Sequence, residues 1–189
     1  MGRAPQIDRD AVLRAGLLVA ERDGVDGLTM GAVATELDVT PMALYRHIGN
    51  RAGLLDGLVE LLIDEPTPAP AGADWEQQLR HGAEQLRETA QRYPNTFPLV
   101  LRLPATTPVA RRRRDQICDV LRRAGVPDDD VARLERVIST LYLGYLVSEV
   151  GGRFAHHDRA VLDRDLELVW TMVRDTIDAA AGRAPRPAG

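Results

Sequence analysis

The 189-residue sequence predicts an all-α protein. Hydrophobic residues make up 44% of the chain, enough for a core, whereas aromatic residues, which favour strands, make up only 4%. The apolar residues recur at spacings of three and four, which places them on one face of a helix, and no stretch shows a convincing strand pattern. Glycine and proline separate these stretches. We therefore expect a series of helices joined by loops.

The first predicted helix runs from Asp8 to about Arg22. Asp8 can cap its N-terminus, because a short carboxylate side chain accepts a hydrogen bond from an N–H of the first turn. Leu13 and Leu17 lie four residues apart on one face of this helix. Gly24 follows, and glycine suits the left-handed conformation that commonly ends a helix. Residues 1–6 form a loose arm ahead of this helix.

Two short helices are predicted between Gly27 and Arg51. The first opens at Thr29, and apolar residues at positions i, i+3, i+4 and i+7 share one of its faces: Met30, Val33, Ala34 and Leu37. The second opens at Thr40, with Pro41 at the first helical position, where the missing N–H costs nothing.

The second short helix can pack on the first through Leu44 and Ile48, which lie four residues apart. Gly49 and Asn50 are expected to end it. Two short helices held at a fixed angle, with a polar and aromatic outer face, have the geometry that fits a DNA major groove. The pattern therefore indicates a helix-turn-helix.

Prolines, glycines and capping pairs divide the rest of the chain into further helices. Three prolines within residues 66–70 predict an extended connector. Asp74 and Gln77 have the spacing of a capping box, which restarts the helical pattern. The expected helices lie at about 51–65, 74–92, 107–124, 128–150 and 158–181, with a short apolar piece at 97–103.

The composition argues against several classes of protein. A formal net charge of −4 argues against indiscriminate nucleic-acid binding, so any DNA contact must come from locally placed arginines. The single cysteine, Cys118, excludes an intrachain disulfide and a cysteine zinc site. Because no stretch resembles a signal peptide or a membrane span, we expect a cytoplasmic protein without membrane contact.

A dense set of residues follows one pattern without a gap: Gly27, Leu28, Thr29, Met30, Val33, Ala34, Leu37, Val39, Ala43 to Ile48, Asn50, Arg51, Leu54 and Leu55. This pattern resembles the DNA-binding domain of the TetR family of transcriptional repressors over roughly residues 8–58. The tract from Tyr45 to Arg51 is particularly similar to the branch that contains the tetracycline repressor.

The resemblance implies a role in DNA binding for the side chains of this segment. Arg46 is able to make a bidentate contact with guanine, or to reach a phosphate. Tyr45 could instead pack in the core, and His47 could be a simple surface histidine. The family's phosphate-contact positions are matched here by Thr29, Tyr45, His47 and Arg51. Its base-facing positions are matched by Thr40, Pro41, Met42 and Ala43.

Two residues depart from the family pattern. Asp38 occupies the turn position where glycine is usual, and it can adopt the left-handed conformation at some cost. Gly31 lies inside the first short helix, where it lowers helix propensity by about 1 kcal/mol and removes one side chain that could read bases. The operator sequence therefore cannot be read from these positions.

The resemblance also implies the domain organisation and the partners. A helix-turn-helix domain spans residues 1–50, and a helical ligand-binding and dimerisation domain spans 51–181. The two prolines and two arginines of residues 182–189 separately predict a disordered tail. The implied protein is a homodimeric repressor that a small-molecule effector releases from palindromic double-stranded operator DNA, and it needs no cofactor or metal. The apolar surface of the last two long helices independently supports a dimer, because Gly144, Ser148 and Gly151 allow close approach.

Several residues of the second domain are candidates to contact the effector, although each could instead pack in the core. They are large or polar side chains on otherwise aliphatic helices: Trp75, Phe97, Leu101, Arg102, Cys118, Tyr142 and Tyr145. The arginines at 111–114 are interpreted as a solvated helix face paired with Asp115 and Asp119. His156 and His157 point apart, and no third ligand at helical spacing completes a metal site.

Two other classes of function remain open. An enzyme with an all-α cavity is disfavoured because the sequence lacks a Ser-His-Asp order, a phosphate-binding glycine loop and paired catalytic carboxylates. The second alternative is a relative of the same fold that binds small molecules or proteins but no DNA. Gly31 and the acidic net charge are the observations that favour it.

Overall fold

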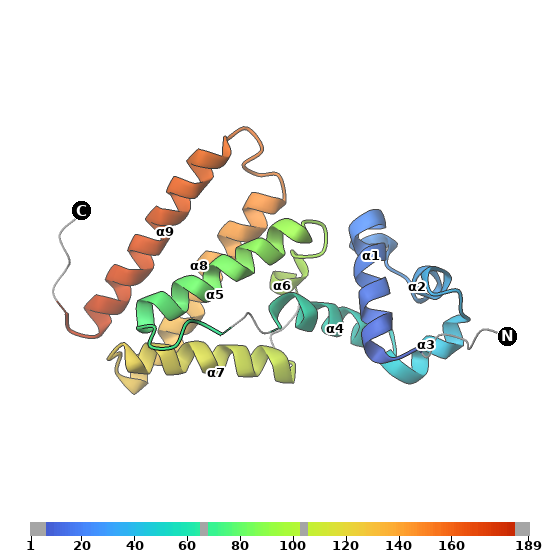
Figure 1. Ribbon diagram of the computed structural model, residues 1–189, viewed down its shortest axis with the longest axis horizontal. Coiled ribbons are helices and arrows are strands. Elements are labelled where there is room, and N and C mark those ends of the chain that lie inside the picture. Colours follow the sequence, from blue (N-terminus) through green and yellow to red (C-terminus); the bar gives the residue numbers. More distant parts are fainter. Residues whose placement is uncertain (1–6, 65–67, 103–105, 184–189) are drawn as a thin grey trace.

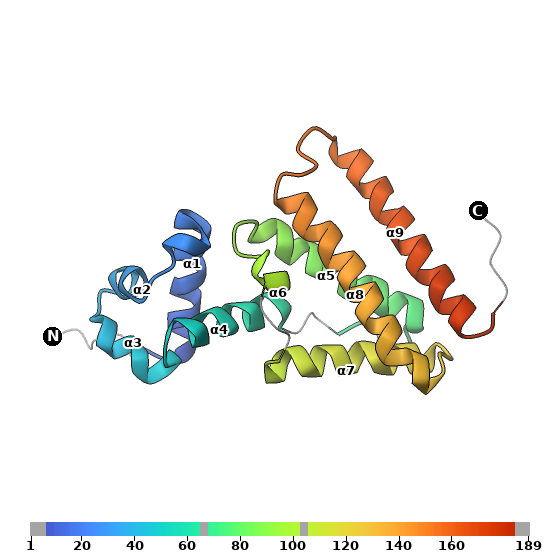
Figure 2. The same cartoon turned by 180° about the vertical axis from the view of Figure 1, so that it is seen from behind.

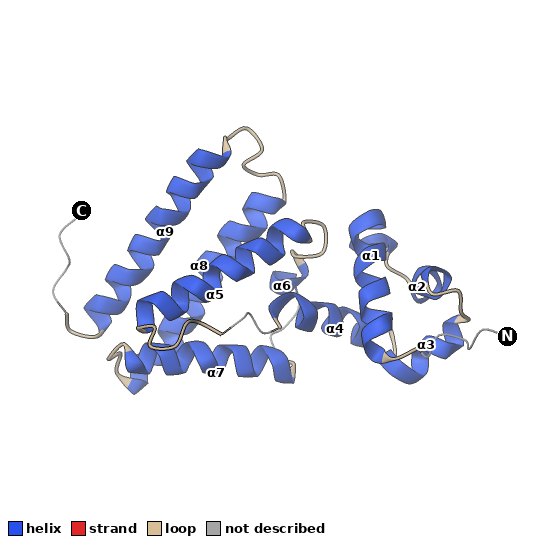
Figure 3. Cartoon of the chain, in the orientation of Figure 1, coloured by secondary structure: helices blue, strands red, loops and turns tan. Residues whose placement is uncertain are grey.

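The computed structural model describes residues 7–64, 68–102 and 106–183, and every regular element in these ranges is a helix (Figures 1 and 3). The predicted fold class is therefore confirmed. Four segments lie outside the described ranges: residues 1–6, residues 65–67 in the proline-rich connector, residues 103–105 and residues 184–189. The helices are α1 (Arg9–Gly27), α2 (Met30–Glu36), α3 (Pro41–Ile48), α4 (Arg51–Ile63), α5 (Trp75–Arg92), α6 (Leu99–Arg102), α7 (Pro108–Arg123), α8 (Asp128–Val150) and α9 (Arg159–Ala180).

Local capping signals set most of the helix ends. The Asp8 side chain accepts a hydrogen bond from Ala11 N at the start of α1, at 2.7 Å. Asp74 and Gln77 form the predicted capping box at the start of α5. Gly24 adopts φ 76°, but the chain resumes a helical turn after it, so α1 reaches Gly27 rather than ending near residue 22.

The two short helices form as expected, with a sharp turn between them. Thr29 caps α2 by accepting a hydrogen bond from Ala32 N at 3.0 Å. Asp38 has φ 53°, the left-handed conformation that its position requires. At the end of α3, Gly49 has φ 77°, and Asn50 caps α4 instead of merely ending α3.

The molecule has two parts joined by α4 (Figures 1 and 2). Helices α1 to α3 lie at one end, and α5 and α7 to α9 lie at the other. The N-terminal half of α4 packs closely on α1, because Gly16 and Gly57 leave room for leucines of the facing helix. A Cβ atom on Gly57 would lie 2.4 Å from Leu13 Cδ2.

One hydrophobic core extends from α1 into the second part of the molecule. Its buried residues come mainly from α1 to α4, and they are joined by Ala90, Phe97, Leu99 and Leu146. Polar contacts reinforce the same junction: the Glu21 carboxylate accepts hydrogen bonds from the backbone N–H groups of Asn95 and Thr96, at 3.2 and 2.7 Å. The packing is therefore continuous across residue 50, the expected domain boundary.

A second core joins α7, α8 and the C-terminal half of α9. Arg183, three residues after the end of α9, extends this contact: it bonds Asp178 at 2.6 Å, and its guanidinium also donates to the carbonyl of Ala124. Arg183 belongs to the segment that the sequence predicts to be disordered. It has a defined position because these two groups and the face of Trp75, 5.4 Å away, hold it.

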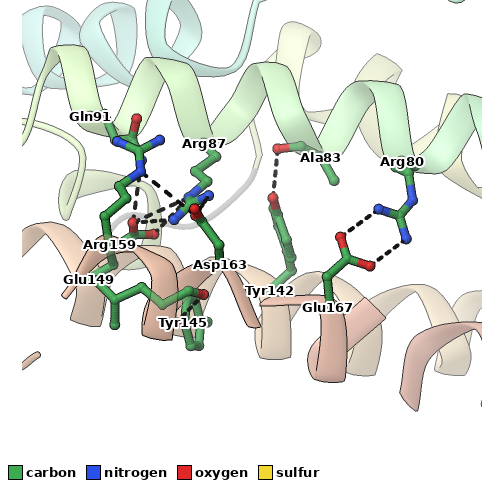
Figure 4. A network of polar contacts seen from close by, with 11 residues as sticks. Arg80, Ala83, Arg87, Gln91, Tyr142, Tyr145, Glu149, Arg159, Asp163 and Glu167 are labelled. Atoms are coloured by element: carbon green, nitrogen blue, oxygen red, sulfur yellow. Dashed lines mark hydrogen bonds and ion pairs between the residues drawn. The ribbon is translucent and has the colours of Figure 1, made fainter. Parts of the chain in front are cut away.

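Polar bridges hold the N-terminal half of α9 against α5 and α8 (Figure 4). Arg87 of α5 bonds both oxygens of Glu149 on α8, at 2.7 and 3.1 Å, and Asp163 on α9, at 2.6 Å. Arg80 makes a two-point contact with Glu167 of α9 one turn further along, at 2.7 and 2.9 Å.

In the described residues, no helix is both long enough and apolar enough to cross a bilayer.

Candidate nucleic-acid interface and ligand cavity

Helix α3 has one buried face and one exposed face. Leu44 and Ile48 are 0% and 7% exposed and anchor the helix on the core. On the other side Met42 is 74% exposed and Tyr45 is 44% exposed, although both are large apolar side chains. Tyr45 therefore does not pack in the core, which was the alternative that the sequence left open. An exposed apolar and aromatic face on a short helix is a surface available to a partner.

The remaining predicted DNA-binding residues lie around this face. Thr29 is exposed at the N-terminus of α2, where unpaired N–H groups favour an anion. His47 is partly buried and lies at the end of α3. The residues at the start of α3 that match base-facing positions are exposed or partly exposed, as is the neighbouring arginine: Thr40, Pro41, Met42, Ala43 and Arg46.

Arg51 differs from the other predicted phosphate contacts. Its Nε donates a hydrogen bond to Leu28 O at 3.1 Å, and its Nη2 donates one to Val25 O at 3.2 Å. The guanidinium is thus directed to the last turn of α1 and to Leu28, which joins α1 to α2. Sequence spacing could not show this, because the partners lie 23 and 26 residues away.

A cavity of about 240 Å³ lies between α4, α5 and α7. Polar groups of α5 at spacings of three and four residues form much of its wall, together with the end of α4 and one arginine of α7. The lining residues are Leu62, Ile63, Asp64, Gly82, Gln85, Leu86, Glu88, Thr89, Arg92 and Arg113. Its polar wall suits a ligand that carries several hydrogen-bonding groups.

Arg113 reaches this cavity because α5 has a glycine beside it. A Cβ atom on Gly82 would lie 2.7 Å from Arg113 Nη2, so the guanidinium lies against the backbone of α5. Arg113 is therefore partly buried, while the other three arginines of the 111–114 run are exposed, as predicted. Asp119, predicted to pair with this run, instead bonds Arg122 at 2.7 Å, and Arg122 lies outside the run.

The ten described residues that line the cavity include none of the seven candidate ligand residues. Phe97 is fully buried in the first core, whereas Leu101 and Arg102 are exposed on α6. Cys118 is buried in the second core, and burial raises the pKa of its thiol, which stays protonated at neutral pH. Trp75 packs against the second core and Arg183.

The two tyrosine candidates hold helices together. Tyr142 donates a hydrogen bond from its hydroxyl to Ala83 O on α5 at 2.7 Å, and burial raises the pKa of this phenol. Tyr145 donates to Leu162 O on α9 at 3.1 Å, and burial raises its pKa to about 12 (Figure 4). Both hydroxyls are therefore protonated and bound to the chain itself.

The polar stripe of α5 is the signal that could have located the cavity. Gln85, Glu88, Thr89 and Arg92 recur at helical spacing in a helix that the sequence already predicts. A search for large residues on aliphatic helices passes over them, because α5 is mostly polar. Among the described residues, no group of three histidine, cysteine or acidic side chains is arranged to hold a metal ion.

Comparison with known proteins agrees with this architecture. Residues 67–169 match the model of the tetracyclin repressor-like C-terminal domain. The transcriptional repressor DrrR1 of Streptomyces coeruleorubidus is 24% identical over 187 residues, which cover 97% of this chain and 68% of DrrR1. The tetracycline repressor protein class D of Escherichia coli is 37% identical over 92 residues, covering 47% of this chain and 42% of that repressor.

Solved structures extend the similarity to the whole fold. The crystal structure of BioQ from Mycobacterium smegmatis matches with a TM-score of 0.79 at 25% identity, over 92% of this chain and 99% of BioQ. BioQ bound to its double-stranded DNA operator matches with a TM-score of 0.74 at 26% identity, with the same coverage of both chains. Since the C-terminal family model covers more than half of the sequence, the chain belongs to the TetR family of transcriptional regulators.

Proposed function

We propose that this transcriptional regulator is a repressor that binds a palindromic DNA operator as a homodimer and is released by a small molecule. The exposed face of α3 carries this proposal, because Met42 and Tyr45 leave a large apolar and aromatic surface without cover in the free chain. BioQ, which shares the fold at 26% identity, has been solved with its DNA operator. The enzyme alternative gains no support from relatives, which are named as transcriptional regulators.

The proposed interface divides into two kinds of contact. Thr29, Tyr45 and His47 bind phosphates and set the orientation of the protein on the duplex. The start of α3 faces the base edges, where Met42 and Ala43 contact thymine methyl groups and Arg46 is able to contact guanine. Because few of these side chains form base-specific hydrogen bonds, much of the affinity comes from the phosphates and depends on salt.

The cavity is the proposed effector site, and α4 is its link to DNA. Leu62, Ile63 and Asp64 line the cavity at one end of α4, while Arg51 lies at the other end beside the helix-turn-helix. An effector that prefers one orientation of α4 shifts the dimer toward that state by its differential affinity for the two states. Domain 1–50 then serves as the DNA-binding unit and 51–181 as the sensing unit.

The test uses duplexes that the wild-type protein selects from a randomised DNA library. We expect Tyr45→Ala to weaken binding by about 10- to 100-fold, since it removes a charge-assisted hydrogen bond to phosphate and an aromatic contact surface. Tyr45→Phe, which keeps the ring, should lose less affinity. Wild-type affinity should fall steeply as salt increases in a titration by fluorescence anisotropy. Failure of the wild-type protein to enrich any duplex would contradict the proposal.

Helices α8 and α9 carry the proposed dimer surface. Val137 and Leu141 of α8 are 59% and 39% exposed, and Leu168 and Met172 of α9 are 61% and 52% exposed. Each pair is spaced by four residues, so each forms a ridge on one face of its helix. Gly144 lies on the same face of α8, three residues after Leu141, where it allows a second helix to approach.

Replacing Gly144 by leucine should disrupt the dimer without harming the single chain. Apart from its chain neighbours and the backbone of its own helix, a Cβ atom at this position would meet no described atom within 4 Å, so the added side chain points into open space. In the dimer it would separate the facing helices. We expect analytical sedimentation to show that Gly144→Leu is a folded monomer. The control is Gly31→Leu, at an exposed helical glycine outside this surface, and it should remain dimeric. A dimer unaffected by Gly144→Leu would place the interface elsewhere.

A further inference from the structure

Arg51 connects the first residue of α4 to the last turn of α1 and to Leu28, which joins α1 to α2. Two of its five N–H donors are used: Nε donates to Leu28 O at 3.1 Å, and Nη2 donates to Val25 O at 3.2 Å. A guanidinium can span two carbonyl oxygens in this way because its donors form a rigid, planar fork. The side chain therefore links elements that are 23 and 26 residues apart in sequence.

The turn that Arg51 binds determines where α2 begins. Gly24, with φ 76°, redirects the chain, and Leu28 N donates to the same Val25 O that accepts from Arg51, at 3.3 Å. Leu28 is fully buried, which fixes its carbonyl group relative to the core. Thr29 follows directly and caps α2. Movement of this turn would therefore displace the N-terminus of α2.

The other end of the link is equally well fixed. Gly49, with φ 77°, ends α3, and the Asn50 side chain accepts a hydrogen bond from Gly53 N at 3.0 Å to cap α4. Arg51 comes next in the chain, so its position follows that of the α3–α4 corner. The proposed phosphate contacts lie on both sides of this link, with Thr29 at α2, and Tyr45 and His47 on α3.

We propose that Arg51 is a positioning residue for operator binding, which holds the N-terminus of α2 at a fixed distance from α3. Its charge is directed to carbonyl groups of the protein rather than to a DNA phosphate. This inference rests on the proposed DNA-binding function, and it assigns to Arg51 a different role from the one that the family resemblance implies. The link keeps Thr29 in register with Tyr45 and His47 along one phosphate backbone.

Arg51→Lys separates the two roles, because lysine keeps the charge but lacks the planar fork whose two nitrogens bond Leu28 O and Val25 O. If Arg51 positions α2, the variant should bind the selected duplex about tenfold more weakly. If it contacts phosphate, lysine should preserve affinity. Arg122→Lys is the matched control, since Arg122 is exposed on α7, outside both proposed surfaces, and pairs with Asp119 and Asp128. Affinity of Arg51→Lys equal to that of the wild type would overturn the proposal.

Arg51→Gln adds a second readout through salt. The logarithm of the binding constant falls with the logarithm of the salt concentration, and loss of one phosphate contact makes this negative slope shallower by about 0.9. A positioning residue should instead leave that slope unchanged while affinity falls at every salt concentration. A slope reduced by about one would overturn the proposal and restore the phosphate role.

Hydrogen exchange tests the link in the absence of DNA. In Arg51→Lys, the amides from Met30 to Val33 at the start of α2 should exchange several-fold faster, because the turn before them loses two hydrogen bonds. Amides of α7 and α8 should keep their wild-type rates. Exchange unchanged in α2, or accelerated equally throughout, would contradict the positioning role. A wild-type protein that selects no duplex would instead count against the proposed function, while this measurement still decides the role of Arg51.

Discussion

Replacing Arg87 by methionine is expected to lower the free energy of unfolding by about 3–5 kcal/mol, measured by urea denaturation at neutral pH. The side chains of Arg87 and Glu149 are only 15% and 8% exposed, so they are shielded from water. Without the guanidinium, Glu149 remains as an uncompensated charge in a poorly hydrated site. Asp163 on α9 also loses its shorter ion pair and keeps the longer one with Arg159, at 3.7 Å. The bridge between α5, α8 and α9 would be lost.

Two comparisons test this explanation. Arg80→Met should cost less than about 1 kcal/mol, because Arg80 and Glu167 are 37% and 64% exposed and water screens them. Arg87→Met combined with Glu149→Met should recover much of the lost stability, since the unpaired carboxylate is gone. Equal effects of Arg87→Met and Arg80→Met would show that burial does not govern the contribution of this network.

The same bridges make the stability of the protein depend on pH. The guanidinium of Arg87 holds the pKa of Asp163 below its usual range, and that of Arg80 does the same for Glu167. A carboxyl group with a lowered pKa stabilises the folded state above its pKa in the unfolded chain. That contribution is lost as pH falls through the lower, folded-state pKa.

Gly53→Ala is expected to impair both stability and operator binding. An added Cβ atom would lie 2.2 Å from the backbone oxygen of Ile48, so the corner between α3 and α4 must open. We expect a loss of about 1–3 kcal/mol in the free energy of unfolding, typical of overpacking. Because α3 moves relative to α4, binding to the selected duplex should weaken as well, as measured by fluorescence anisotropy.

Gly31→Ala provides the matched control for this substitution. There the new Cβ atom would lie 3.8 Å from Thr29 Oγ1, an ordinary contact distance. Alanine in place of an exposed glycine inside α2 should stabilise the protein by up to about 1 kcal/mol through helix propensity. If the two variants had the same stability, close contact at Gly53 would not explain the effect.

Helix ends could be read from the sequence because capping is local. Asp8, Thr29 and the Asp74–Gln77 pair each act on an N–H group within three residues, so their spacing in the sequence is their spacing in space. Asp38 was similarly readable, since the turn requires a left-handed residue there. Gly49 and Asn50 end α3 as predicted, and Asn50 has a second role, because the residue that follows α3 also caps α4.

The contacts that the sequence did not reveal join distant positions. Arg87 and Glu149 are 62 residues apart, and no local periodicity relates their charges. Arg113 reaches the cavity only because Gly82 of another helix leaves space for it. Size and polarity are what mark the candidate ligand residues in the sequence. These properties do not distinguish Tyr142, bound to a backbone carbonyl, from a side chain that faces an open cavity.

The hydrophobic core shared by both parts limits how freely this protein can be recombined with its relatives. Phe97, Leu99 and Leu146 belong to the same buried core as side chains of the N-terminal helices, so residues of the second part help to support the helix-turn-helix. A chimera that joins residues 1–50 of this protein to the ligand-binding domain of a relative would lack these core residues, so the helix-turn-helix would pack poorly on the new domain. Transplanting DNA specificity therefore requires exchanging surface residues of α3 rather than the whole N-terminal segment. Evolution of new operators can follow the same route without disturbing the sensor.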